Sequence, residues 1–499
     1  MSMRRHPLGV LTGFAIIFAL LLSNRTLAQA SLDVQLKSAL AMAGFTGKIE
    51  STLETRLGRR VDPALADLGR QLWFDTISGL HGDNTCAGCH SPGNGFGDSQ
   101  SIAIGVQNNR MVGPHRAGPR NQRRTPSALN TAFYPALMWN GRFFAPSGDP
   151  FKNSQGFTFP LPEGTTAFPP NHPTIKHLLI AQGHIPPTEL VEAAGFTGTA
   201  GTIAPDFDQF DDGVGLIVPP ADGSGFRNAP IRSAVVARLN NNATYRRSFS
   251  ALFQTVAAGG SIDFVMVARA LAEFEFTLTY ANAPIDRFAR GDTAAMTTAQ
   301  KRGALVFFGK GKCTQCHQVS GKSNEMFSDF KNHVAGIPQV AAFFGVGQGN
   351  VIFDGPGNDE DFGLEQVTGN PADRYKFRTS PLRNVSTQAA FFHNGAFTRL
   401  DDAIRHHLNA ASSARVYSPT AAGLDPDLTY RLGPIDPVLN ALDPLLAQPV
   451  VLSSGEFSDL VTFVREGLLD ARAVPGNACG LAPKKVLSGA TPLRFEACK

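Results

Sequence analysis

The sequence predicts a mainly α-helical protein whose short helices are joined by long ordered loops. Charged residues make up only 17% of the 499 residues, and the chain contains 50 glycines and 34 prolines, a composition unlike that of a coiled coil or a helical bundle. The length suits two or three domains. A short motif occurs in both halves of the chain: the hexapeptide TCAGCH at Thr85–His90 recurs in outline as KCTQCH at Lys312–His317.

The repeated hexapeptide is the arrangement that attaches a c-type haem. Two thiols three residues apart bond to the vinyl groups of the porphyrin, and the histidine that follows serves as the proximal iron ligand. A zinc site would need two further ligands per motif, and a redox CxxC pair lacks the adjoining histidine. The sequence therefore predicts two covalently bound c-type haems, held by Cys86, Cys89 and His90 and by Cys313, Cys316 and His317.

The first thirty residues have the pattern of a secretory signal. Arg4 and Arg5 precede an apolar stretch at Leu8–Leu22, and Ala28-Gln29-Ala30 offers the small residues that a signal peptidase accepts. An uncleaved membrane anchor is the alternative, but the apolar stretch falls short of the ~20 residues that a span needs. We expect cleavage before Ser31 and export of the mature protein to the periplasm.

Cysteine use agrees with export to an oxidising compartment. Four of the six cysteines belong to the haem motifs, which leaves Cys479 and Cys498 in the C-terminal tail. An oxidising compartment favours a disulfide between them, worth roughly 3 kcal/mol by the chain-entropy model; two free thiols are the alternative. A net charge of +4 is too small to indicate nucleic-acid binding.

Four helices are expected outside the motifs. Two of them lead into the haem motifs. A separate feature is the segment at 143–177, which is too long for an ordinary connection and therefore predicts an ordered insertion or a lid. The expected helices cover Ser31–Arg60, Pro63–Phe74, Ser261–Tyr280 and Thr298–Phe308.

Several runs of the sequence together resemble the bacterial dihaem cytochrome c peroxidase and MauG family. They extend in the family's order from about Leu68 to Leu408: LGRQLWFD, TCAGCHSPGNGFGD, RRTPSALNTAFYPALMWNGR, RGALVFFGKGKCTQCH and YKFRTSPLRNVSTQAAFFHNGAFTRLDDAIRHH. The resemblance implies two cytochrome c-like haem domains packed across an interface. We place the N-terminal domain, with the peroxidatic haem, at 31–285, the C-terminal domain, with the electron-transfer haem, at 286–475, and a tail at 476–499.

The resemblance also implies a peroxide site. Family members carry a distal Gln and, ten residues later, a Glu, spacings that Gln182 and Glu192 keep. A carboxylate there can take a proton from the near oxygen of hydrogen peroxide and return it to the departing oxygen, and burial would raise its pKa. Glu189 is the alternative to Glu192 as the acid. Glu192 could instead be a solvated glutamate at a helix start with only a structural role. His184 is expected to be structural.

One departure from the family concerns the loop after the first haem motif. Many of its peroxidases have a histidine there that caps the resting iron, whereas Ser101–Gln107 contains none. The nearest candidate is His115. We therefore expect His90 to be the only protein ligand of the N-terminal haem, as in MauG-like members, which need no reductive activation.

The resemblance also implies roles for residues at the second haem and at the interface between the domains. His407 falls on the position of its sixth ligand, with His406, Met326 and Tyr417 as alternatives, and a second imidazole should lower the potential relative to a His/Met haem. Trp139 falls on the position of the tryptophan between the haems, although a core tryptophan is the alternative. The resemblance also implies a possible calcium ion between the domains, against which stands Arg124 at the position of the asparagine ligand, since an arginine cannot bind a cation.

Three functions follow from these observations. The first is an exported peroxidase that reduces hydrogen peroxide with electrons from a small cytochrome or copper protein. The second is a MauG-like oxidase or oxygenase acting on a protein or organic substrate. The third is an electron-transfer cytochrome without turnover, which Gln182 and Glu192 disfavour because an electron carrier gains nothing from an acid–base group. A homodimer is compatible with the sequence.

Overall fold

The computed structural model describes residues 31–342 and 352–498, so the expected signal segment lies outside the described residues. The fold is mostly helical. A first helix covers 31–42, and the others are α2 (Leu53–Leu57), α3 (Pro63–Phe74), α4 (Cys86–Cys89), α5 (Leu178–Gln182), α6 (Asn228–Asn241), α7 (Ala243–Leu252), α8 (Gln254–Ala257), α9 (Phe264–Thr277), α10 (Pro284–Ala289), α11 (Thr298–Phe308), α12 (Glu365–Thr368), α13 (Leu400–Leu408), α14 (Ala410–Arg415), α15 (Asp436–Asn440), α16 (Ser454–Thr462) and α17 (Pro475–Ala478). In the described part of the chain, no helix has the length and apolar character needed to cross a membrane.

Three two-stranded sheets are the only ladders in the described residues, and each strand has two residues. β1 (Met111–Val112) pairs in parallel with β6 (Arg494–Phe495). β2 (Ala136–Leu137) pairs antiparallel with β3 (Phe143–Phe144), and β4 (Asn332–His333) pairs antiparallel with β5 (Phe377–Arg378). The sheets therefore fasten loops together and do not form a layer of the fold.

The helices that lead into the haem motifs begin and end where local signals place them. Asp62 caps α3 by accepting from the amides of Ala64 and Leu65, with Pro63 at the first helical position. Thr297 and Gln300 form a capping box on α11. Both predicted ranges, Pro63–Phe74 and Thr298–Phe308, are confirmed.

Two other predicted helices are shorter than expected. The expected helix at Ser31–Arg60 ends at residue 42 and resumes only in α2, because Gly44 and Gly47 take left-handed φ angles of 71° and 67°. The helix expected at Ser261–Tyr280 is α9, which begins after its N-cap Asp263 and ends at Thr277.

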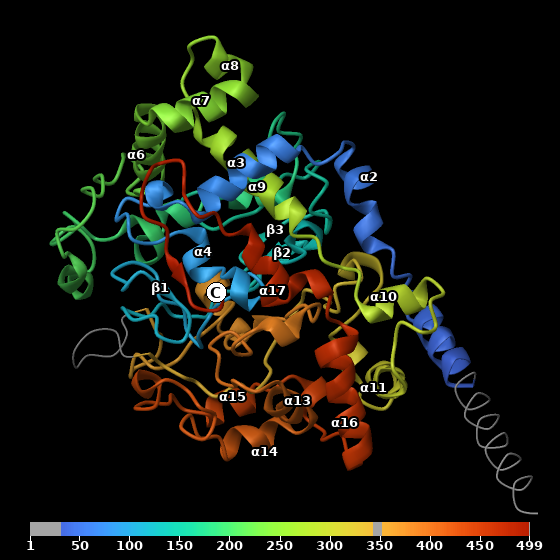
Figure 1. Cartoon of the computed structure of the whole chain (residues 1–499). Helices are drawn as coiled ribbons and strands as arrows, with labels where there is room; N and C mark the ends of the chain where they lie inside the picture. Colours follow the sequence, from blue (N-terminus) through green and yellow to red (C-terminus); the bar gives the residue numbers. More distant parts are fainter. Residues whose placement is uncertain (1–30, 343–351, 499) are drawn as a thin grey trace, which may run out of the picture.

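Each haem motif follows a helix that packs closely on a later helix through a glycine. α3 lies against α9 in the upper part of Figure 1, and α11 lies against α16 in the lower part. A Cβ on Gly69 would lie 1.8 Å from the carbonyl oxygen of Ala270, and one on Gly303 would lie 1.9 Å from that of Asp459. Only glycine allows either close approach.

The ends of the chain pack with the opposite halves. Leu36, Leu40 and Phe45 of the first segment join a core with Phe307 of α11 and Phe463 beyond α16. The C-terminal tail runs back beside α4 (Figure 1), where Phe495 packs on Phe74. Each end of the chain thus packs on residues beyond the domain boundary expected near residue 285. The domain boundaries stay a prediction.

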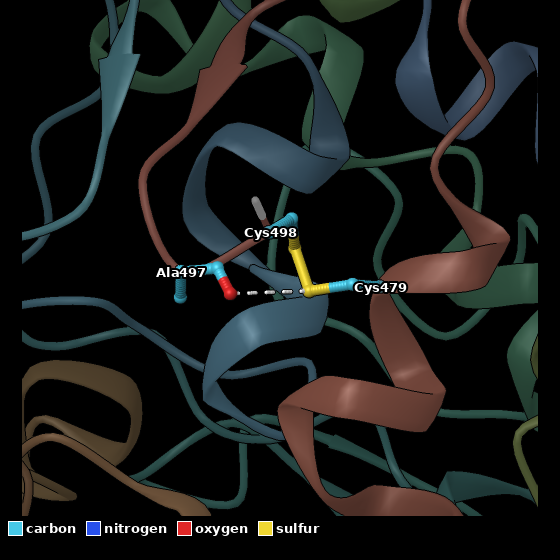
Figure 2. Close-up of a disulfide and its surroundings, with 3 residues drawn as sticks. All are labelled: Cys479, Ala497 and Cys498. Atoms are coloured by element: carbon cyan, nitrogen blue, oxygen red, sulfur yellow. Dashed lines mark hydrogen bonds between the residues drawn. A yellow bond between two sulfur atoms is a disulfide. The ribbon is translucent and has the colours of Figure 1, made fainter.

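The tail is fastened by the disulfide that the sequence analysis expected. Cys479 and Cys498 form a disulfide, and the sulfur of Cys479 lies 3.6 Å from the carbonyl oxygen of Ala497 (Figure 2). A Cβ on Gly93 would lie 2.5 Å from the side chain of Ala497. The bridge therefore holds the tail against the loop that follows His90.

Two interior segments repeat one another and meet across the molecule. The runs that begin at Arg124 and at Arg378 share an Arg-Thr start and a left-handed asparagine six residues later, Asn130 and Asn384. Both asparagines donate from Nδ2 to the carbonyl of Tyr280, at 3.1 and 3.0 Å. The amide of Arg124 donates to the carbonyl of His393 (2.8 Å), and that of Arg378 to the carbonyl of Trp139 (2.6 Å).

Candidate functional site

The C-terminal site is the cavity lined by Cys313, Cys316, His317 and His407. The Nδ1–H group of His317 donates to the carbonyl of Phe327 (2.9 Å), and that of His407 donates to the carbonyl of Ala403 (2.9 Å). These bonds fix both tautomers and leave both Nε2 atoms free to bind a metal.

The two free imidazoles of this site have the spacing that one shared metal requires. The ring centroids of His317 and His407 are 6.0 Å apart, with planes inclined by 59°. Metal–nitrogen bonds of about 2 Å on opposite sides of one ion give a centroid separation of about 6 Å. Burial lowers the pKa of both histidines, that of His317 to about 4, so both are neutral at pH 7, the form that binds iron. The site therefore fits a six-coordinate haem iron.

The alternative ligands of the C-terminal site are occupied elsewhere. His406 uses both ring nitrogens, on the carbonyl of Ala335 (2.9 Å) and the hydroxyl of Ser413 (3.2 Å). The hydroxyl of Tyr417 donates to the carbonyl of Ala396 (2.5 Å), and Met326 is fully buried in a different apolar cluster. His407 is the candidate that the geometry favours.

The N-terminal site is formed by Cys86, Cys89 and His90 around α4. Thr85 caps this short helix by accepting from the amide of Gly88. The Nδ1–H group of His90 donates to the carbonyl of Phe96 (3.1 Å), so Nε2 is again free for iron, and burial lowers the pKa of His90 to about 4. The ring packed on His90 is the indole of Trp73, 5.4 Å away.

His115 does not provide a second ligand at the N-terminal site. Its side chain is 79% exposed and its Nδ1 lies 2.8 Å from Glu496 in the tail. The loop that lacks the histidine, Ser101–Gln107, is instead fixed in place: the amide of Val106 donates to the carbonyl of Val191, 3.1 Å away. A Cβ on Gly105 would lie 1.9 Å from the same oxygen.

Glu192 lies close to the first haem motif. It belongs to the π-helical turn Leu190–Ala194, and its carbonyl accepts from Nδ2 of Asn84 (2.8 Å), an atom 3.7 Å from the sulfur of Cys89. Burial, reinforced by the negative charge of Glu189, raises the pKa of Glu192 to about 7. This carboxyl can therefore exist in both protonation states near neutral pH, as a proton-transfer group requires.

The other residues predicted near the peroxide site are placed as follows. Gln182 is the last residue of α5, and the chain reaches Glu192 through a turn at Pro186–Thr188. Glu189 lies 3.8 Å from Arg142, so its charge is partly compensated. His184 is buried, with Nδ1–H donating to the carbonyl of Ile180 (2.8 Å), which indicates a structural role.

The segment at 143–177 is an ordered part of an apolar core. Phe143 and Phe159 stack with centroids 4.4 Å apart, and Phe168 packs on Phe159. These rings belong to the cluster that also contains Phe276 of α9.

Trp139 lines the C-terminal cavity. It is 7% exposed, and its indole N–H donates to the carbonyl of Arg124 (2.7 Å). The guanidinium of Arg124 lies 3.4 Å from the amide oxygen of Gln388.

Sequence reasoning missed three residues that hold the two sites. Asn84 positions the main chain of Glu192 and accepts from the buried Arg116 (2.8 Å). Arg378 lines the C-terminal cavity. The repeat of the Arg-Thr segments at Arg124 and Arg378 was the signal that could have revealed Arg378.

Comparison with known proteins agrees with this geometry. The profile of the family described as di-haem cytochrome c peroxidase matches residues 63–294. The cytochrome-c peroxidase IdrP1 of Pseudomonas sp. (strain SCT) is 25% identical over 68% of this chain and 70% of its own. The methylamine utilization protein MauG of Methylophilus methylotrophus is 26% identical over 69% of this chain and 72% of its own.

A solved structure shares the fold. The diheme peroxidase BthA from Burkholderia thailandensis E264 matches with a TM-score of 0.50 and 20% identity, covering 87% of this chain and 91% of that one. Family profile, relatives and fold agree with the two motifs. Residues 63–294 match the di-haem cytochrome c peroxidase family, the relatives are cytochrome-c peroxidases and MauG proteins, and the chain is an oxidoreductase that binds two c-type haems.

Proposed function

We propose that this protein is an exported peroxidase that reduces hydrogen peroxide to water at the N-terminal site. One haem is attached at Cys86 and Cys89 and the other at Cys313 and Cys316. Electrons from a small cytochrome or copper protein enter at the C-terminal site and pass by way of Trp139. The observation that carries the proposal is the contrast between the sites: His317 faces a second imidazole, whereas the N-terminal site has a carboxyl of raised pKa nearby.

The residues of the N-terminal site divide the work of proton transfer. When bound, the haem supplies an iron centre that binds and reduces peroxide. Glu192, as carboxylate, accepts the proton of the near peroxide oxygen and returns it to the departing oxygen, which leaves as water. Gln182 holds the peroxide by hydrogen bonding. Each turnover takes up two electrons and two protons and releases two water molecules.

The residues of the C-terminal site act in electron transfer. His317 and His407 would hold the haem iron of this site, and two imidazole ligands would leave no position for peroxide. The indole of Trp139, fixed by its bond to Arg124, offers a polarisable path between the sites.

A MauG-like oxidase is the second candidate, favoured by one observation. The loop Ser101–Gln107 contains no histidine and is pinned against Val191. The ferric protein should therefore react with peroxide without prior reduction. Substrate oxidation would then compete with electron delivery from a redox partner.

Stopped-flow mixing of the fully ferric protein with one equivalent of hydrogen peroxide tests these proposals. A fast change of the Soret band is expected. A reaction only in the half-reduced protein would disprove the open N-terminal site, and no reaction in either state would favour a plain electron carrier. Trp139→Phe should leave the first spectral change intact and slow the later oxidation of the C-terminal haem.

A further inference from the structure

Two buried arginines line the C-terminal cavity from the side of Trp139. Arg124 and Arg378 are each 4% exposed, and both are among the cavity's lining residues together with His317 and His407. They occupy equivalent positions in the repeated segments, so they approach the cavity from two different parts of the chain.

Neither guanidinium has a carboxylate partner in the described chain. Arg124 contacts only the amide oxygen of Gln388 (3.4 Å) and the carbonyl of Asp98 (3.5 Å), both longer than an ordinary N–H···O bond, and its Nε has no partner. Arg378 is held by the carbonyls of Met138 (2.9 Å) and Thr379 (3.2 Å). No ion pair within 4 Å involves either residue in the ranges that the structure describes.

The cavity itself contains no compensating negative charge. No aspartate or glutamate is among its described lining residues. A third arginine in the lining, Arg383, is paired through both terminal nitrogens with Asp286 at 2.7 and 2.8 Å. Asp98, the acid nearest Arg124, already accepts from the amides of Gln100 and Thr125.

An unpaired buried guanidinium is costly. Burial lowers the pKa of Arg124 and of Arg378 to about 10, so both still carry their charge at neutral pH. The penalty for such a charge in a protein interior is of order several kcal/mol per ion unless an anion pairs with it. The cavity is therefore built for a ligand with two negative groups.

We propose that Arg124 and Arg378 bind the two propionate carboxylates of the haem at the C-terminal site. Arginine binds carboxylates by strong charge-assisted hydrogen bonds, and haem carries two of them on one edge. The inference rests on the proposed haem attachment at Cys313 and Cys316. It adds the orientation of that haem.

The orientation has a consequence for electron transfer. The main chain of Arg124 accepts from the indole of Trp139, and the main chain of Arg378 donates to the carbonyl of Trp139. The two propionate-binding residues thus hold the tryptophan from both sides, and the propionate edge of the haem faces it.

The test compares purified dihaem variants Arg124→Gln and Arg378→Gln with Arg124→Lys and Arg378→Lys. Resonance Raman spectra report the propionate bending modes of the low-spin haem, and redox titration gives its midpoint potential. Lys331→Gln is the matched control, since it removes an exposed cation that does not line the cavity. Folding should survive the Gln changes, because neither guanidinium forms an ion pair within 4 Å in the described residues, and Asp98 keeps its hydrogen bonds from the amides of Gln100 and Thr125.

The Gln variants should shift the propionate bands and make the potential more negative, because loss of a nearby cation favours ferric iron. A tenfold change in the ferric-to-ferrous ratio at fixed potential corresponds to about 59 mV. The Lys variants should restore much of the shift, and Lys331→Gln should change little.

Unchanged bands and potential in both Gln variants would overturn the proposal, as would equal haem loss in the Gln and Lys variants, which would mark a structural role. Neither readout uses peroxide. The result is therefore independent of the peroxidase proposal, which is tested by the stopped-flow reaction with hydrogen peroxide.

Discussion

The segments that lead into the two haem motifs are built alike, whereas the surroundings of the two motif histidines differ. α3 and α11 each pack through a glycine on a later helix, and His90 and His317 each donate from Nδ1 to the carbonyl of a phenylalanine with positive φ. The ring packed on His90 is that of Trp73, whereas Phe307 holds the corresponding place beside His317.

The difference lies in the residues that other parts of the chain bring near the two motifs. At the C-terminal site α13 brings a second imidazole, His407, to within 6.0 Å of His317. Near the N-terminal site a π-helical turn brings Glu192, while the neighbouring loop has no histidine. The same scaffold thus presents a second imidazole at one site and a carboxyl near the other, each supplied from a distant part of the chain.

The largest effect is expected from His407→Ala. Removing the second imidazole should convert the C-terminal haem from low-spin to high-spin, making it resemble its N-terminal counterpart, as seen in the electronic and EPR spectra. His406→Gln is the control and should keep the low-spin spectrum, because both nitrogens of His406 bond to the protein. A low-spin second haem in His407→Ala would show that another residue binds the iron.

Glu192→Gln should remove proton transfer from the N-terminal site. We expect peroxide kcat/KM to fall by roughly 10²–10⁴-fold, the usual contribution of general acid–base catalysis, with both haem spectra retained. Steady-state peroxide reduction measures the loss. Unchanged turnover would exclude Glu192 from the mechanism.

Loss of the disulfide should affect the two sites unequally. Replacing Cys479 and Cys498 by alanine should lower the free energy of unfolding by about 3 kcal/mol, measured by denaturant titration. The tail contacts the N-terminal half through Phe495 on Phe74 and through Ser488, whose hydroxyl donates to Asp75 (2.6 Å). The N-terminal haem spectrum should therefore change first, and simultaneous loss of both would contradict this placement of the tail.

The smallest effect is expected from Glu189→Gln. Glu192 must be ionised to accept a proton, so kcat/KM should rise with pH through about 7, the pKa of Glu192. Removing the neighbouring negative charge lowers that pKa and should move the rising limb to lower pH. Asp206→Asn, a change at an exposed acid, is the control and should leave the pH profile unchanged. If the rising limb of kcat/KM does not move in Glu189→Gln, the charge of Glu189 does not raise the pKa of Glu192.

The sequence by itself determined the features that depend on neighbouring residues. The CxxCH motifs, the ends of α3 and α11, and the departure of Ser101–Gln107 from the family are local patterns of thiols, caps and composition. The helix expected at Ser31–Arg60 failed for a local reason too, since two left-handed glycines interrupt it.

Only the tertiary structure decided which distant residues meet. His317 and His407 come together because α13 packs beside the second motif, and Arg124 and Arg378 line one cavity because two repeated segments pair across the molecule. The raised pKa of Glu192 depends on what buries it. No spacing in the sequence encodes these contacts, because burial and apposition are set by the packing of the whole chain.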